Sequence, residues 1–164
     1  MNDFHLAQVN IALPVAPLDS AELADFVAAL DPVNAVADAA PGFVWRLQTE
    51  DGDATAVRAF GDDRLIVNMS VWESIEDLAE FAFRDQDHQA VLRRRREWFH
   101  RMREAHSVLW WVPAGHRPTV AEAEHRLGLL REHGPTPEAF TFRAPFPPPG
   151  APSITADRDW FCPA

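Results

Sequence analysis

The sequence of 164 residues contains no lysine and no tyrosine, and all 15 of its basic residues are arginines. Catalysis through a lysine Schiff base is therefore excluded, as are a tyrosine acid and a tyrosyl radical. The single cysteine, Cys162, stands beside a proline near the C-terminus, so the chain has no disulfide framework and only a poor cysteine nucleophile. Histidines, carboxylates, hydroxyls, amides and arginines remain as candidate catalytic groups.

Long apolar runs and an excess of positive charge are also missing. No run is long enough to span a bilayer, and residues 1–10 lack the basic and apolar regions of a secretory signal. We therefore expect a cytoplasmic protein that makes no membrane contact. The net charge of −10 argues against a nucleic-acid binder, whose binding surface would be basic. The 47% hydrophobic content favours one globular domain.

The order of apolar patterns predicts a fold of two β-α-β halves followed by an added helix. A helix that begins at Asp19 or Ser20 is expected to break at Pro32, and a later helix is expected to restart at Asp85 or Asp87. Strands are expected at 4–14, 43–48, 64–72 and 107–115, and the last helix at 119–134. This order predicts an α+β fold: a ferredoxin-like split βαβ sheet with helices on one face.

A faint internal repeat refines this expectation. "VNIA" from residue 9 resembles "VNMS" from residue 67, and an acidic amphipathic helix follows each of them. In the ferredoxin-like order the first and third strands lie side by side, which would bring Asn10 next to Asn68. The strands are nearly continuously apolar, so both sheet faces should be covered, and we expect a homodimer to cover the second face.

The chain divides into a domain of residues 1–149 and a Pro-rich tail of residues 150–164. The tail ends in Trp160 and Phe161, and burying each could contribute about 2 kcal/mol. We therefore expect the tail to dock and Trp160 to be substantially buried. A disordered terminus is the alternative.

Polar residues recur on one side of the two central strands. Gln8 and Asn10 alternate onto one face of the first strand, and Asn68, Ser70 and Trp72 do the same on the third. Buried amides and hydroxyls need partners. They either bond one another in a closed network or line a pocket between the sheet and the helices, and the pocket is the hypothesis that we carry forward.

His88 is the best catalytic candidate among the seven histidines. It is expected in the first turn of its helix, on the same inward face as Arg95, where the helix N-terminus disfavours a positive charge. It can then act as a base or as an axial ligand, or it can be a structural core histidine. Arg95 can hold a carboxylate or form an internal salt bridge. No histidine spacing indicates a metal site.

Several segments resemble a known family. "LIVNMSVWES", "RRRREWFHRM" and "VLWWVPAGHRPTVAEA" are similar to the bacterial domain-of-unknown-function family 3291, over roughly residues 5–147. That family lies in the dimeric α/β-barrel superfamily, near the antibiotic-biosynthesis monooxygenases. The resemblance implies the same fold, a homodimer and a small-molecule substrate.

A looser resemblance links the chain to haem-degrading monooxygenases of this superfamily. They carry an Asn on the first strand, matched here by Asn10, and a Trp and a His on the helix after the third strand. His88 matches the His, but the Trp position falls near Phe81, so the indole is not matched. This departure argues against haem ring opening more than against haem binding.

Three functions follow as hypotheses. The first is a monooxygenase-like enzyme without a cofactor, acting on a small, largely apolar or aromatic molecule. Here His88 is the base, Asn10 and Asn68 stabilise an oxyanion, and the other residues named above, Gln8, Ser70, Trp72, Phe81 and Arg95, bind the substrate. The second is a haem protein with His88 as axial ligand. The third is a non-catalytic ligand-binding or interaction module.

Overall fold

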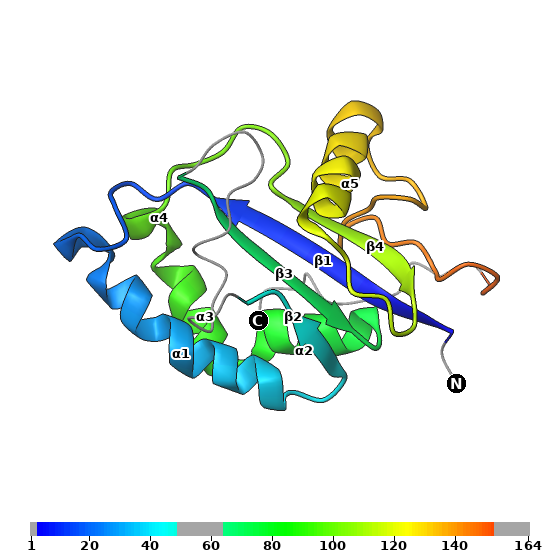
Figure 1. The fold of residues 1–164 in the computed structure, drawn as a ribbon, viewed down its shortest axis with the longest axis horizontal. Helices are drawn as coiled ribbons and strands as arrows, with labels where there is room; N and C mark the ends of the chain where they lie inside the picture. The colour runs from blue at the N-terminus through cyan, green and yellow to red at the C-terminus, as the bar shows by residue number, and fades with distance from the viewer. Residues whose placement is uncertain (1–2, 49–63, 153–164) are drawn as a thin grey trace.

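The computed structural model describes residues 3–48 and 64–152 of the chain. These residues form a four-stranded antiparallel sheet, in the strand order β2-β3-β1-β4, with helices packed against it (Figure 1). The strands are β1 (Phe4–Ala12), β2 (Phe43–Arg46), β3 (Ile66–Trp72) and β4 (Ser107–Pro113). The helices are the short 3-10 helix η1 (Ala21–Leu23), α1 (Ala24–Ala39), α2 (Ile75–Arg84), α3 (Gln86–Arg93), α4 (Arg95–Trp98) and α5 (Val120–His133).

This topology confirms the predicted α+β, ferredoxin-like split βαβ fold. The first half is β1-α1-β2, and the second half is β3 followed by α2 to α4 and then β4. β1 and β3 are the central pair, and Asn10 lies directly opposite Asn68 in their register. The position that the internal repeat predicted for these two asparagines is therefore confirmed.

Side-chain alternation along β1 and β3 gives the sheet two different faces. Gln8, Asn10 and their neighbours at even positions share one face with the even residues of β3, because cross-strand partners point to the same side. That face packs against α1 to α4, through Phe26, Ile75 and Trp98 among others. The catalytic candidates on the strands therefore all lie on the side of α1 to α4.

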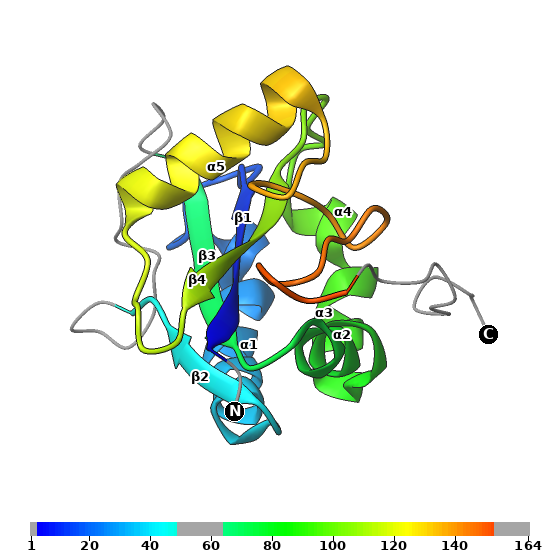
Figure 2. The ribbon, with the colours of Figure 1, turned by 90° about the vertical axis from the view of Figure 1, so that its right-hand side faces the viewer.

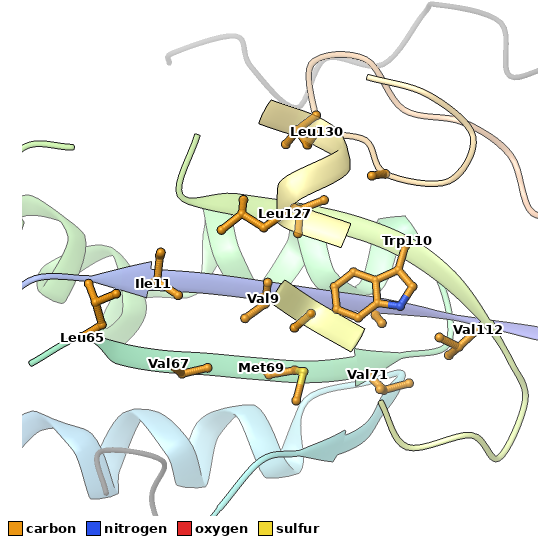
Figure 3. Packing of buried hydrophobic residues seen from close by; sticks show 14 residues of the cluster. Val9, Ile11, Leu65, Val67, Met69, Val71, Trp110, Val112, Leu127 and Leu130 are labelled. Atoms are coloured by element: carbon orange, nitrogen blue, oxygen red, sulfur yellow. The ribbon is translucent and has the colours of Figure 1, made fainter. Parts of the chain in front are cut away.

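The opposite face of the sheet is covered by α5, the helix added after the second half (Figure 2). Figure 3 shows Val9, Val67 and Met69 on this face, together with Leu127 and Leu130 of α5. Val9, Val67 and Met69 are at most 1% exposed within one chain. A homodimer therefore no longer follows from an uncovered sheet face, and it stays a prediction.

The predicted break at Pro32 is wrong, because α1 runs without interruption from Ala24 to Ala39 with Pro32 inside it. A proline in a helix interior removes one hydrogen bond and costs about 3 kcal/mol or more. Buried residues stand on both sides of the proline, Phe26 before it and Ala37 after it. Packing of both halves against the rest of the protein offsets this local cost.

Two other helix ends match their predictions. Asp85 caps α3, where its side chain accepts a hydrogen bond from the His88 N–H at 2.9 Å. Gly134 ends α5 with φ +72°, and its N–H donates to the Leu130 carbonyl. The predicted docking of Trp160 concerns residues outside the described part of the chain and stays a prediction.

Candidate functional site

A cavity of about 200 Å³ lies between the sheet and the helices α1, α3 and α4. Most of its wall is apolar, with Phe26 and Leu30 from α1, Ile66 from β3 and Leu92 from α3. Its polar lining residues are Asn10, Asn34, Arg46, Asn68, His88 and Arg95. A mainly apolar cavity with a few polar groups is the usual form of a small-molecule site.

The sequence therefore identified four of the six polar lining residues, and the fold brings them together. Asn10 and Asn68 come from the central strands, His88 from the first turn of α3, and Arg95 from the start of α4. The helical segment after β3 is broken at Asp85 and at Arg94, and these two breaks determine which residues of α3 and α4 face the sheet. The hypothesis of a pocket at these asparagines is supported by the cavity that they line.

His88 is a half-buried imidazole with one nitrogen already occupied. Its Nδ1 lies 2.8 Å from the carbonyl oxygen of Ala82. A carbonyl oxygen only accepts hydrogen bonds, so Nδ1 carries the proton in the neutral ring, and Nε2 keeps its lone pair. Within the cavity, His88 therefore offers an acceptor, which can serve as a base.

Burial lowers the pKa of His88 below its ordinary value. The hydrogen bond to Ala82 and the negative charge of Asp85 act in the opposite direction but are the smaller effects. The imidazole is therefore neutral at pH 7. The Phe81 ring packs against it, with ring centroids 4.9 Å apart, and also stacks on the Trp72 ring, with centroids 5.4 Å apart.

Phe81 and Trp72 do not line the cavity, although both were expected to bind the substrate. The Phe81 ring contacts the rings of both Trp72 and His88, and it lines a separate pocket between α1 and α2. Trp72 is 1% exposed. They form a support behind His88, because bulky rings restrict the orientation of the imidazole.

Gln8 and Ser70, which were also expected to bind the substrate, do not line the cavity. Both are buried, and the Gln8 Nε2 donates to the Ser70 Oγ at 2.8 Å. The Trp72 indole N–H donates to the same oxygen, also at 2.8 Å. These three residues are hydrogen-bonded to one another next to the cavity. Such an internal network was the alternative to a pocket for all the polar residues on this face of the two strands.

Asn68 and Asn10 stand at the open end of this network. The Asn68 Oδ1 accepts a bond from Gln8 Nε2 at 3.4 Å, and the Asn10 Nδ2 donates to Gln8 Oε1 at 3.5 Å. The Asn68 amide NH₂ has no partner among the described residues, and the Asn68 side chain is exposed to the cavity. Gln8 thus orients two amides that can donate hydrogen bonds to a bound oxygen atom.

The two arginines of the cavity differ in their surroundings. Arg46 is held by Asp38, with Nε and Oδ1 2.7 Å apart. Arg95 is half-buried with its guanidinium over the Phe99 ring, 6.0 Å from the ring centroid. No carboxylate pairs with Arg95 within residues 3–48 and 64–152.

Sequence reasoning missed Arg46 and Asn34 as lining residues. Arg46 ends a four-residue strand, β2, whose register with β3 shifts at Trp45, so its direction could not be read from a simple alternation. Asn34 follows Pro32, where the helix was expected to end, and its place on the cavity wall depends on the continuity of α1. Neither position carries a motif that could have revealed it.

Haem does not fit this site. The His88 Nε2 has the lone pair that an axial ligand needs. However, the cavity of about 200 Å³ is smaller than the ~300–1,000 Å³ of pockets that hold drug-sized ligands, and a tetrapyrrole is larger still.

In the described part of the chain, no three His, Cys, Asp or Glu side chains stand close enough to hold a metal ion. No helix there is long and apolar enough to cross a membrane.

Solved structures that resemble the chain include several small bacterial proteins. A Nitrosomonas europaea protein described as a candidate antibiotic biosynthesis monooxygenase has a TM-score of 0.46 and 11% identity, with 73% of this chain and 97% of that chain covered. PA3566 from Pseudomonas aeruginosa has a TM-score of 0.45 and 11% identity, with 70% of this chain and 95% of that chain covered. SnoaB, a cofactor-independent oxygenase from Streptomyces nogalater, has a TM-score of 0.42 and 17% identity, with 73% of this chain and 98% of that chain covered.

Likeness at this level carries no information about activity. No curated protein matches the chain in sequence. The family comparison is more specific, because the match extends over residues 5–156 and so reaches beyond residue 147, where the motif resemblance ended. It includes every strand and helix of the described structure from His5 onward. The chain belongs to the domain-of-unknown-function family DUF3291.

Proposed function

We propose that the protein is a monooxygenase-like enzyme that acts on a small, largely apolar or aromatic molecule in the cavity between sheet and helices. His88 removes a proton from the substrate, and Asn68 and Asn10 stabilise the anion that forms. The observation that carries this proposal is the state of His88. Its Nδ1–H is fixed on the Ala82 carbonyl, and its pKa is lowered by burial, so a basic Nε2 is available at neutral pH.

The asparagines supply the second requirement, which is stabilisation of negative charge. A phenol that loses its proton in an apolar cavity leaves an oxyanion that needs hydrogen-bond donors. Gln8 holds the Asn68 amide by its oxygen, which leaves the NH₂ group to donate. Donors fixed in advance by a buried network stabilise a charge without having to reorganise, and this is the role that we assign to Gln8 and Ser70 as positioning residues.

The chemistry can be written for a simple phenol, 1-naphthol, with O₂ as the co-substrate. His88 takes the hydroxyl proton, and the electron-rich ring carbon para to the oxyanion forms a bond to O₂. The resulting hydroperoxide loses water: one oxygen atom stays on carbon as a carbonyl, and the other leaves with the two hydrogens. The balance is C₁₀H₈O + O₂ → C₁₀H₆O₂ + H₂O, so the substrate supplies all the electrons and no external reductant is needed.

The test measures oxygen-dependent conversion of 1-naphthol to 1,4-naphthoquinone by the purified chain. His88→Gln keeps a polar side chain but removes the base, and we expect the rate to fall about 10²- to 10⁴-fold. His125→Gln is the matched control, because His125 is exposed on α5 across the sheet from the cavity.

Two results would contradict this proposal, one for the role of His88 and one for enzymatic function as a whole. A folded His88→Gln variant that keeps the full rate contradicts the role of His88. A wild-type chain that binds phenols in the cavity but converts neither 1-naphthol nor related bicyclic phenols contradicts enzymatic function, and it leaves a non-catalytic ligand-binding module.

A further inference from the structure

Arg95 carries a positive charge inside the cavity that no carboxylate of the described chain neutralises. The neighbouring Arg94 shows the contrast, since it pairs with Asp25 at 3.0 Å and with Glu97 at 2.9 Å. Arg46, which also lines the cavity, is paired with Asp38. Arg95 instead lines the cavity with its guanidinium over the Phe99 ring.

This charge persists under all ordinary conditions. Burial lowers the pKa of the Arg95 guanidinium, but a guanidinium does not lose its proton in proteins. Two histidines are near it: His88 lines the same cavity, and the charge of Arg95 acts on His106. Burial first, and then the charge of Arg95, lowers the pKa of His106, and burial lowers the pKa of His88. Both rings are therefore neutral at pH 7 and add no positive charge of their own, so Arg95 is the cationic group among the three.

A partly buried charge without a counter-ion is unfavourable, and an anionic ligand would relieve that cost. The net charge of the chain is −10, so its overall field does not attract anions. Among the residues that line the cavity, Arg95 is the position that can give a local preference for an anion. Because Arg46 is already neutralised by Asp38, the cavity offers one net positive charge, which matches a carboxylate better than a phosphate dianion.

We propose that the natural substrate is an aromatic or apolar carboxylic acid, whose carboxylate binds Arg95 while its ring lies against Phe26, Leu30 and Leu92. This inference rests on the proposed function for the role of His88, and it adds the chemical class of the substrate. The guanidinium fork can donate two parallel hydrogen bonds to a carboxylate, which would fix one end of the molecule. The reacting end is then held at His88 and Asn68.

The binding test compares two molecules of nearly the same shape, 1-naphthoic acid and the neutral 1-naphthamide, by isothermal titration calorimetry at pH 7. We expect the wild-type chain to bind the acid about 10- to 100-fold more tightly, the usual worth of a charged hydrogen-bonded pair. Arg95→Gln should abolish this preference, and Arg95→Lys, which keeps the charge but not the fork, should retain part of it.

Arg96→Gln is the matched control, because it removes the same charge from the same helix at an exposed position that does not line the cavity. It should keep the preference for the acid. Equal affinity of the wild-type chain for acid and amide would overturn the proposal. So would an equal loss of preference in the Arg95→Gln and Arg96→Gln variants, since that would indicate general surface charge.

The oxidation assay separates this inference from the proposed function. 5-Hydroxy-1-naphthoic acid carries the phenol and the carboxylate on one ring system and should be oxidised with a lower KM than 1-naphthol. Oxidation of 1-naphthol that depends on His88, without any preference for acids, would refute the acid site alone. Acid binding that depends on Arg95, unchanged in His88→Gln and without oxidation of either phenol, would refute the enzymatic proposal alone.

Discussion

Ser70→Ala tests whether the closed network beneath the cavity stabilises the fold. The Ser70 hydroxyl oxygen accepts two hydrogen bonds of 2.8 Å, one from Gln8 and one from the Trp72 indole. After its removal, Gln8 still has Asn68 at 3.4 Å, whereas the indole N–H of Trp72, 1% exposed, loses its acceptor. A buried donor left unpaired costs about 1–3 kcal/mol.

With the weakened bond of Gln8 added, we expect Ser70→Ala to lower the free energy of unfolding by about 2–3 kcal/mol. For a chain of this size, this corresponds to a fall in Tm of about 5–10 °C. Urea unfolding followed by circular dichroism gives the free energy. The control Ser107→Ala removes an exposed hydroxyl from β4 and should change it by less than about 0.5 kcal/mol.

A double-mutant cycle with Trp72→Phe isolates the indole bond. Phenylalanine has no N–H, so Ser70→Ala should cost less in the Trp72→Phe background, with a coupling energy of about 0.5–3 kcal/mol. The reasoning is refuted if Ser70→Ala is no more destabilising than Ser107→Ala. It is also refuted if its cost is the same in both backgrounds, because the indole N–H would then not be the group left unpaired.

Four further predictions concern His88, α3, haem and assembly. Oxidation of 1-naphthol should be level above pH 7 and should fall as the pH drops through the folded-state pKa of His88, which lies below the ordinary value; a midpoint above pH 7 would contradict this. Since the unfolded chain protonates His88 more readily, stability should also fall with pH in that acid range, and the His88→Gln variant should lose this part of the dependence. Asp85→Ala removes the N-cap of α3 and should lower the free energy of unfolding by about 1 kcal/mol in urea denaturation. Asp87→Ala changes a residue of the first turn that does not cap the helix, and it should have little effect. Titration with hemin should give no saturable Soret shift, because the cavity is too small, and a shift that His88→Gln abolishes would prove this wrong. Sedimentation velocity at micromolar concentration tests the homodimer expected from the family resemblance, and a single species of 18.4 kDa would reject it.

The fold was accessible from the sequence because its signals are local and repeated. Alternation along β1 and β3, together with the repeat at Asn10 and Asn68, determined which strands are central and in which register. The cap at Asp85 was equally readable, since an aspartate stood at the start of a new apolar stripe. Pro32 misled because its local cost is visible in sequence, whereas the packing that offsets it is not.

The candidate site was only partly accessible for a related reason. Alternation places Gln8, Ser70 and Trp72 on the same face as Asn10 and Asn68, but it does not say how far along the strands the cavity extends. That limit is set where side chains from the helices meet the sheet. His88 and Arg95 lie inside that limit and Phe81 lies outside it, and such distances between elements cannot be derived from a strand pattern.

The interruption between α2 and α3 has a chemical consequence for His88. In an unbroken helix, the carbonyl of Ala82 would accept the N–H of Gln86, four residues on. Here the backbone is extended at Asp85, with φ −68° and ψ 127°, so that carbonyl belongs to the last turn and has no partner within its helix. The imidazole of His88 takes this place. The helix break thus selects the tautomer of the ring, and a change that fused the two helices could exchange the roles of its two nitrogens while every residue lining the cavity stayed the same.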